Sequence, residues 1–210
     1  MKKAFVLIVL FILPLVAYIF FASGVNNFGK LPILTESIQD ISSISKNHTL
    51  EDKITILGFL GSDIEQVKGN VFNLNQKIYK RFHEFNDFQM VMIVPLGAEN
   101  MVEGLKKELG QFTDTKKWNF VFANPEEIKM LFKGLKTDLK LDENLGNPSV
   151  FIIDKERNLR GRDDDEEDGI KYGFNTISVA ELNNKMEDDV KIILAEYRLA
   201  LKKNNADRSK

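Results

Sequence analysis

The feature that most constrains the fold is an alternation of short apolar runs with amphipathic stretches along most of the chain. Four apolar runs occupy residues 54–60, 88–95, 118–122 and 149–154. Runs of this length are typical of strands that are buried on both faces of a sheet. Because strands that alternate with helices pair in parallel, the pattern predicts an α/β protein with a mainly parallel sheet.

The stretches between these runs repeat apolar residues every three or four positions, which indicates amphipathic helices. We expect helices over residues 67–85, 100–109, 126–133 and 178–202. Asn124 and Pro125 form a favourable start for the third helix, since asparagine caps an N-terminus and proline fits the first turn. Residues 158–162 follow the last apolar run after a polar turn, and we expect a β-hairpin there. The hairpin would add antiparallel strands to the sheet.

The N-terminus carries an apolar run preceded by two lysines. Residues 5–22 contain only apolar residues, proline and tyrosine, and about 20 such residues cross a bilayer as a helix. Lys2 and Lys3 favour a cytoplasmic N-terminus and a body on the outer side. We expect an uncleaved transmembrane anchor over 1–23; the alternative is a signal peptide, although 21–24 lacks a clear cleavage pair. This predicts a single-pass protein of the bacterial inner membrane with a periplasmic C-terminal domain.

The rest of the chain fits one domain. With 210 residues, the chain is long enough for a single well-packed core. We expect a linker over 24–30, the folded domain over 31–202, and a disordered tail rich in lysine and asparagine over 203–210. The net charge of −2 gives no sign of nucleic-acid binding.

The chain contains no cysteine. Disulfide exchange proceeds by attack of a thiolate, so this protein cannot perform it. Thiol-dependent peroxidase chemistry is excluded in the same way. No hydrolytic triad, phosphate-binding loop or catalytic carboxylate pair is recognisable either. We therefore expect a protein that is not an enzyme and that holds no cofactor.

Three features together resemble a known family: the N-terminal anchor, the strand 54–61 that leads into a helix ending at 77–82, and the segment 147–155 before the hairpin. The chain is similar to the Sco/SenC branch of the thioredoxin-like superfamily, whose members are membrane-anchored copper chaperones or thiol reductants in cytochrome oxidase assembly. The resemblance implies a thioredoxin-like fold, with a central mixed sheet and flanking helices.

The resemblance also implies where the family's copper ligands would stand. A C-x-x-x-C pair at the start of the first helix corresponds to Ile64 and Lys68, and a distal histidine corresponds to the region 146–148. No histidine follows His83. Copper(I) prefers soft sulfur ligands, and neither Ile64 nor Lys68 supplies one. The cysteine and histidine ligands of the family are therefore all missing from this sequence.

What remains is an edge that could bind a protein partner, still unidentified, in envelope or respiratory-complex assembly. We expect this edge to comprise Ser62, Asp63, Ile64, Lys68, Asn147 and Pro148. In thioredoxin-like folds a cis-proline faces the active-site loop, and we expect the Asn147–Pro148 bond to be cis. Its backbone could then pair with an extended peptide. The alternative is that Pro148 only sets the turn into the hairpin.

The acidic run 163–168 is the most unusual local feature. Asp164, Glu166 and Asp168 match positions one, three and five of a calcium-binding loop, but Asn175 stands where the bidentate glutamate belongs. A solvated loop of mutually repelling charges is therefore the favoured interpretation. Calcium binding at this loop is the second functional hypothesis.

Overall fold

The structure, a computed structural model, describes residues 10–16, 18 and 30–208, without side chains beyond residue 200. The expected anchor (1–23) and linker (24–30) lie mostly outside the described residues; residues 10–16 are helical. Within the part of the chain that is described, no helix has the length and apolar character needed to span a bilayer.

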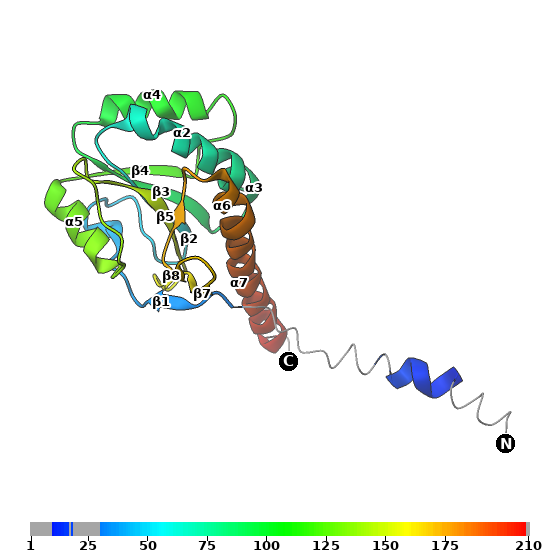
Figure 1. Ribbon diagram of the computed structural model, residues 1–210. Coiled ribbons are helices and arrows are strands. Elements are labelled where there is room, and N and C mark those ends of the chain that lie inside the picture. Colours follow the sequence, from blue (N-terminus) through cyan, green and yellow to red (C-terminus); the bar gives the residue numbers. More distant parts are fainter. Residues whose placement is uncertain (1–9, 17, 19–29, 209–210) are drawn as a thin grey trace, which may run out of the picture.

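A mixed seven-stranded sheet forms the centre of the domain (Figure 1). Its strands are β1 (Ile33–Thr35), β2 (Ile54–Leu60), β3 (Phe88–Pro95), β4 (Trp118–Ala123), β5 (Gly146–Ile153), β6 (Leu159–Arg160) and β9 (Phe174–Asn175). The order is β1-β6-β5-β2-β3-β4, and β9 also pairs with β5. A separate hairpin consists of β7 (Arg162–Asp165) and β8 (Gly169–Lys171).

The pairing confirms the mixed sheet. Strand β2 pairs in parallel with β3, and β3 pairs in parallel with β4. Strand β5 runs antiparallel to β2 and to β6, which confirms the predicted hairpin. The edge on that side is formed by β1, which pairs with β6. Segment 54–60 thus occupies the middle of the sheet, as its apolar composition predicts.

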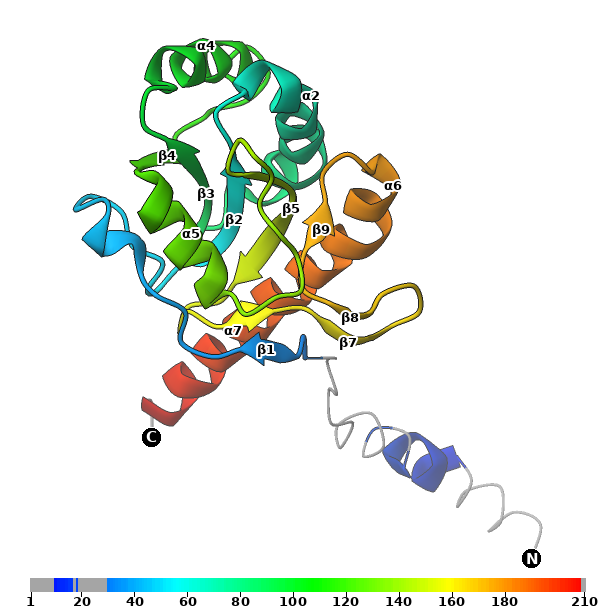
Figure 2. The same cartoon turned by 60° about the vertical axis from the view of Figure 1, so that its left-hand side comes forward.

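The helices lie on both faces of the sheet (Figures 1 and 2). They are η1 (Ile41–Ser43), α2 (Ile64–Leu74), η2 (Asn75–Tyr79), α3 (Lys80–Phe82), α4 (Glu99–Leu109), α5 (Pro125–Gly134), α6 (Val179–Glu181), η3 (Leu182–Met186) and α7 (Glu187–Arg208). Asn124 caps α5 through a reciprocal pair of hydrogen bonds with Glu127, which confirms the predicted helix start.

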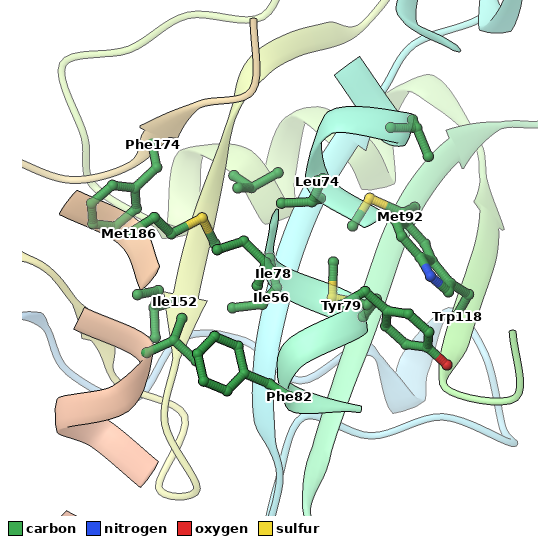
Figure 3. Packing of buried hydrophobic residues seen from close by; sticks show 14 of the residues in the cluster. Ile56, Leu74, Ile78, Tyr79, Phe82, Met92, Trp118, Ile152, Phe174 and Met186 are labelled. Atoms are coloured by element: carbon green, nitrogen blue, oxygen red, sulfur yellow. The ribbon is translucent and has the colours of Figure 1, made fainter. Parts of the chain in front are cut away.

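Alternate residues of each central strand enter two separate cores. In β2, Ile56 packs under α2 and α7, whereas Leu57 packs under α5 and η1. Figure 3 shows the first core, where Ile56 and Ile78 lie among aromatic and methionine side chains. Both faces of the sheet are therefore covered, which explains why the strand sequences are apolar throughout.

Two helical stretches differ from expectation because each contains a π-helical turn. The first begins at Ile64, earlier than the predicted residue 67, and passes through η2 before ending at Phe82. The wider turn buries Asn75, Ile78 and Tyr79 together. The last stretch passes through η3 and continues as α7 to Arg208, beyond residue 202.

Candidate functional site

The candidate site lies where β2 ends and α2 begins. Gly61 turns the chain with a φ of +74°, and a Cβ there would lie 3.0 Å from the carbonyl oxygen of Asn144, so this position requires glycine. The backbone N–H of Ser62 donates to the same carbonyl at 3.0 Å. Asp63 caps α2, since its Oδ1 accepts a hydrogen bond from the N–H of Gln66 at 3.2 Å.

Ile64 occupies the first position that the resemblance assigns to a cysteine. Its side chain is 0% exposed and belongs to the core beneath α2. An apolar side chain in this position contributes packing, and it offers no atom to a metal or to an electrophile. The position therefore supports the fold and no longer faces a ligand.

Lys68 occupies the second of these positions and is held by carboxylates. Its Nζ lies 2.5 Å from Oε1 of Glu108 on α4 and 3.6 Å from Oε2 of Glu65. The hydrogen bond with Glu108 raises the pKa of Lys68 above its usual value. Because its ammonium group pairs with α4, Lys68 is directed toward that helix and not toward Pro148.

Pro148 lies in β5 opposite the end of β2, as the resemblance implies. The neighbouring Asn147 pairs with Phe59 of β2. The Asn147–Pro148 peptide bond is trans, so the expectation of a cis bond is wrong. The Pro148 carbonyl accepts hydrogen bonds from both the N–H and the hydroxyl of Thr176. The backbone group expected to receive a partner peptide is therefore occupied by the chain itself.

A shallow hollow separates α2 from β5 beside Pro148. Its volume is about 20 Å³, enough for about one water molecule. Its lining includes Val67 and Leu74 of α2, Met92 of β3 and Pro148. A hollow of this size cannot enclose a small-molecule substrate, but its apolar walls can accept a methyl group of a partner.

The structure brings together most of the predicted edge. Ser62 contacts the loop that precedes β5 through Asn144, and the hollow joins α2 to Asn147 and Pro148. Ile64 lies beneath this surface and Lys68 lies to one side. Sequence reasoning missed Thr176 and Ile177, because the two-residue strand β9 is too short to give a periodic signal.

The acidic run forms the β7–β8 hairpin, which was expected to be an unstructured loop. Asp165 is buried and accepts hydrogen bonds from Nζ of Lys185 at 2.9 Å and from the N–H groups of Glu167 and Asp168. Burial opposes ionisation, but these hydrogen bonds outweigh it and lower the pKa of Asp165 to about 2. Asp165, Glu167 and Asp168 are thus paired with lysines, whereas Asp163, Asp164 and Glu166 are exposed.

The geometry does not favour the calcium hypothesis. Asp168 is paired with Lys171 at 2.6 Å, and Glu167 is paired with Lys185. No group of three carboxylate or histidine side chains among the described residues is arranged to hold a metal ion. Asp164, Glu166 and Asp168 therefore do not form a ligand set.

The fold and the site define a thioredoxin-like protein: a mixed sheet covered by helices on both faces, with a proline of the antiparallel strand β5 beside α2. Its distinguishing property within that fold is the complete absence of cysteine.

Comparisons with known proteins agree with this class. The sequence matches no protein-family model and no curated protein. Among solved structures, the chain is similar to BsSco, a member of the Sco family of cytochrome c oxidase assembly proteins, with a TM-score of 0.50 and 13% identity over 77% of this chain and 95% of that one. It is also similar to a thiol:disulfide interchange protein of the thioredoxin family from Chlorobium tepidum, with a TM-score of 0.50 and 20% identity over 78% of this chain and 99% of that one. These similarities confirm the thioredoxin-like fold.

Proposed function

We propose that this protein is a membrane-anchored thioredoxin-like protein without redox activity that binds a protein partner during assembly in the bacterial envelope. The observation that carries the proposal is the complete burial of the Ile64 side chain. The position that would carry a thiol in a redox-active thioredoxin-like protein is occupied in this chain by Ile64, which is 0% exposed. The fold is retained while the position that would do chemistry serves packing.

An exposed apolar surface beside this edge supports partner binding. Pro148 is exposed, Ile177 is 61% exposed and Val179 is 42% exposed. Thr176 connects Ile177 to Pro148 through its hydrogen bonds. Apolar side chains that cluster at the surface are common in protein–protein contacts. A partner would then bind through these side chains, because the Pro148 carbonyl is already paired.

The assembly role and the location rest on separate support. The neighbour BsSco belongs to a family of cytochrome c oxidase assembly proteins, which favours an assembly role over an enzymatic one for a chain without thiols. The lysines at the N-terminus and the apolar run that follows them favour an inner-membrane anchor and a periplasmic domain. Leu13 and Val16 in the helical segment 10–16 are more than half exposed, as lipid-facing side chains would be.

The test uses the full-length chain with benzoylphenylalanine at position 177, irradiated in intact cells of the source organism. We expect a discrete crosslinked protein that disappears when Val179→Glu is added. The control position is Phe85, which is 42% exposed and lies before the start of β3, at the opposite end of the strands. Equal crosslinking at both positions, or none at 177, would reject the proposed partner surface.

A second measurement tests the absence of redox chemistry. The purified protein is assayed for reduction of insulin disulfides and for copper(I) binding, with a cysteine-containing thioredoxin-like protein as positive control. We expect neither activity, because the chain supplies no sulfur nucleophile. Clear activity in either assay would overturn the non-redox assignment.

A further inference from the structure

A second surface, distinct from the hollow beside Pro148, carries a different chemistry. A groove of about 530 Å³ runs between α5 and the chain that follows it. Its lining residues are Lys129, Phe132, Lys133, Lys136, Thr137, Leu139, Lys140 and Leu141. Four of them are lysines and none is acidic, although the chain as a whole has a net charge of −2. The groove is therefore a local concentration of positive charge.

These four lysines are available to a ligand. Each of them is exposed, and none forms an ion pair with any carboxylate in the described part of the chain, unlike Lys68, Lys155 or Lys185 elsewhere in the domain. Asp138 lies between two of them in sequence but lines the neighbouring cavity with Asp168 and Lys171. The positive charge of the groove is thus not compensated internally.

The floor of the groove is apolar and rigid. Phe132 is 7% exposed and packs edge-on against Phe59, with ring centroids 5.1 Å apart. The half-buried side chains of Leu139 and Leu141 pack against the same core. The buried hydroxyl of Thr137 has no hydrogen-bond partner among the described residues.

The spacing of the lysines fits an extended chain. Lys129 and Lys133 are one helical turn apart on α5, about 6 Å along its axis. Alternate side chains of an extended peptide are spaced by roughly 6.6 Å. Acidic side chains at every second position would therefore meet Lys129 and Lys133, while the intervening apolar side chains lie on Phe132.

From this geometry we propose that the groove between α5 and Leu141 binds an extended acidic segment of a protein partner, with carboxylates on the four lysines and apolar side chains on the floor. An anionic membrane surface shares the charge, but it is broad and would not enter a groove. The proposal does not depend on binding at the Pro148 edge. The two surfaces lie close, because the side chain of Asn147 donates to the carbonyl of Lys140 at 2.8 Å.

The test measures fluorescence anisotropy of a labelled decapeptide, Glu-Leu-Glu-Leu-Glu-Leu-Glu-Leu-Glu-Leu, with the full-length protein in detergent. We expect saturable binding that weakens as salt rises, since the contacts are between exposed charges. The combined substitutions K129Q, K133Q, K136Q and K140Q should weaken binding by about tenfold or more. The same peptide with glutamine in place of glutamate should bind no better than this variant.

The matched control neutralises four lysines on another surface: K80Q, K106Q, K107Q and K116Q. These lie on or beside α3, α4 and the start of β4, and we expect them to leave peptide affinity unchanged. Equal effects of the two sets, or no binding by the unaltered protein, would overturn the proposal. Vesicles of phosphatidylcholine and phosphatidylglycerol form a parallel arm. If they bind through the groove lysines and the peptide does not, the surface recognises lipid and the acidic-segment proposal fails.

Discussion

The carbonyl oxygen of Pro148 accepts two hydrogen bonds from Thr176, one from its backbone N–H at 2.9 Å and one from its hydroxyl at 2.6 Å. This relationship closes the backbone edge that a thioredoxin-like fold could offer to an extended substrate. Strand β9 continues the closure by pairing with Ser149 and Val150. The chain contains no thiol, and the edge beside Pro148 is covered by its own strand β9.

Thr176→Val removes only the hydroxyl from this arrangement. Because the Pro148 carbonyl keeps its bond from the Thr176 N–H, we expect a loss of unfolding free energy of about 1 kcal/mol, measured by urea denaturation. Thr137→Val is the matched control, since the Thr137 hydroxyl is buried without a partner. Its removal should leave stability unchanged or raise it. A larger loss from Thr137→Val than from Thr176→Val would contradict the assigned hydrogen bonds.

Asp165 should make the free energy of unfolding of the domain depend on pH in the acidic range. Its pKa is lowered from 3.8 to about 2 in the folded protein, because hydrogen bonds from Lys185 and from backbone N–H groups outweigh the effect of burial. A carboxyl group with a lowered folded-state pKa stabilises the fold above its unfolded pKa. This contribution, roughly 2 kcal/mol, is complete above pH 4 and is lost as the pH falls toward 2.

The measurement compares denaturation of the unaltered protein and Asp165→Asn between pH 2 and pH 7. The variant should be less stable at neutral pH, and the difference should shrink at acidic pH. Asp164→Asn, at an exposed neighbouring position, should show no such difference. If the two variants had the same pH profile, the buried ion pair with Lys185 could not be its source.

Calcium should leave thermal unfolding unchanged. Asp165, Glu167 and Asp168 of the β7–β8 hairpin pair with Lys171 or Lys185, so these three carboxylates would have to lose their partners to bind a cation. Asp164 and Glu166 are exposed, but no third ligand is arranged beside them among the described residues. Differential scanning calorimetry with millimolar calcium and with a chelator should give equal Tm values, since a bound ligand must stabilise the state that binds it. A rise in Tm that Asp164→Asn abolishes would restore the calcium hypothesis.

Much of the fold follows from sequence because its strongest signals are local. The strand 88–95 and the capped helix after Asn124 were predicted within a residue or two, since an unbroken apolar run and a cap followed by proline each act within one element. The π-helical turns were not predictable. In η2, the side chain of Asn75 accepts hydrogen bonds from Thr113 and Trp118, which are distant in sequence and give no local signal.

The sequence could predict where the candidate site lies, but not which of its residues are buried or already hydrogen-bonded. Motif resemblance located both Ile64 and Pro148 at one edge, because the order of elements determines which loops meet there. The burial of Ile64 and the hydrogen bonds from Thr176 to Pro148 depend on tertiary packing. No pattern of neighbouring residues in the sequence indicates them. The acidic run shows the same limit, since the lysine that neutralises Asp165 comes from η3, far along the chain.

The burial of Ile64 can be tested by a single introduced thiol, because the chain has no other cysteine. In Ile64→Cys the sulfur should react with Ellman's reagent only when the core opens, whereas in Lys68→Cys it should react directly, since the Lys68 side chain is 27% exposed. An opening free energy of about 3 kcal/mol would slow the reaction of the buried thiol by roughly 100-fold.

Ile64→Cys should also lower the free energy of unfolding by roughly 1–2 kcal/mol, because the smaller side chain leaves a cavity. Equal reactivity of the two thiols would mean that position 64 faces the surface, and would contradict the buried position of Ile64. If the predicted inequality is found, we expect the double variant with Ile64→Cys and Lys68→Cys to show neither disulfide exchange nor copper binding, because one of its two sulfur atoms lies in the core.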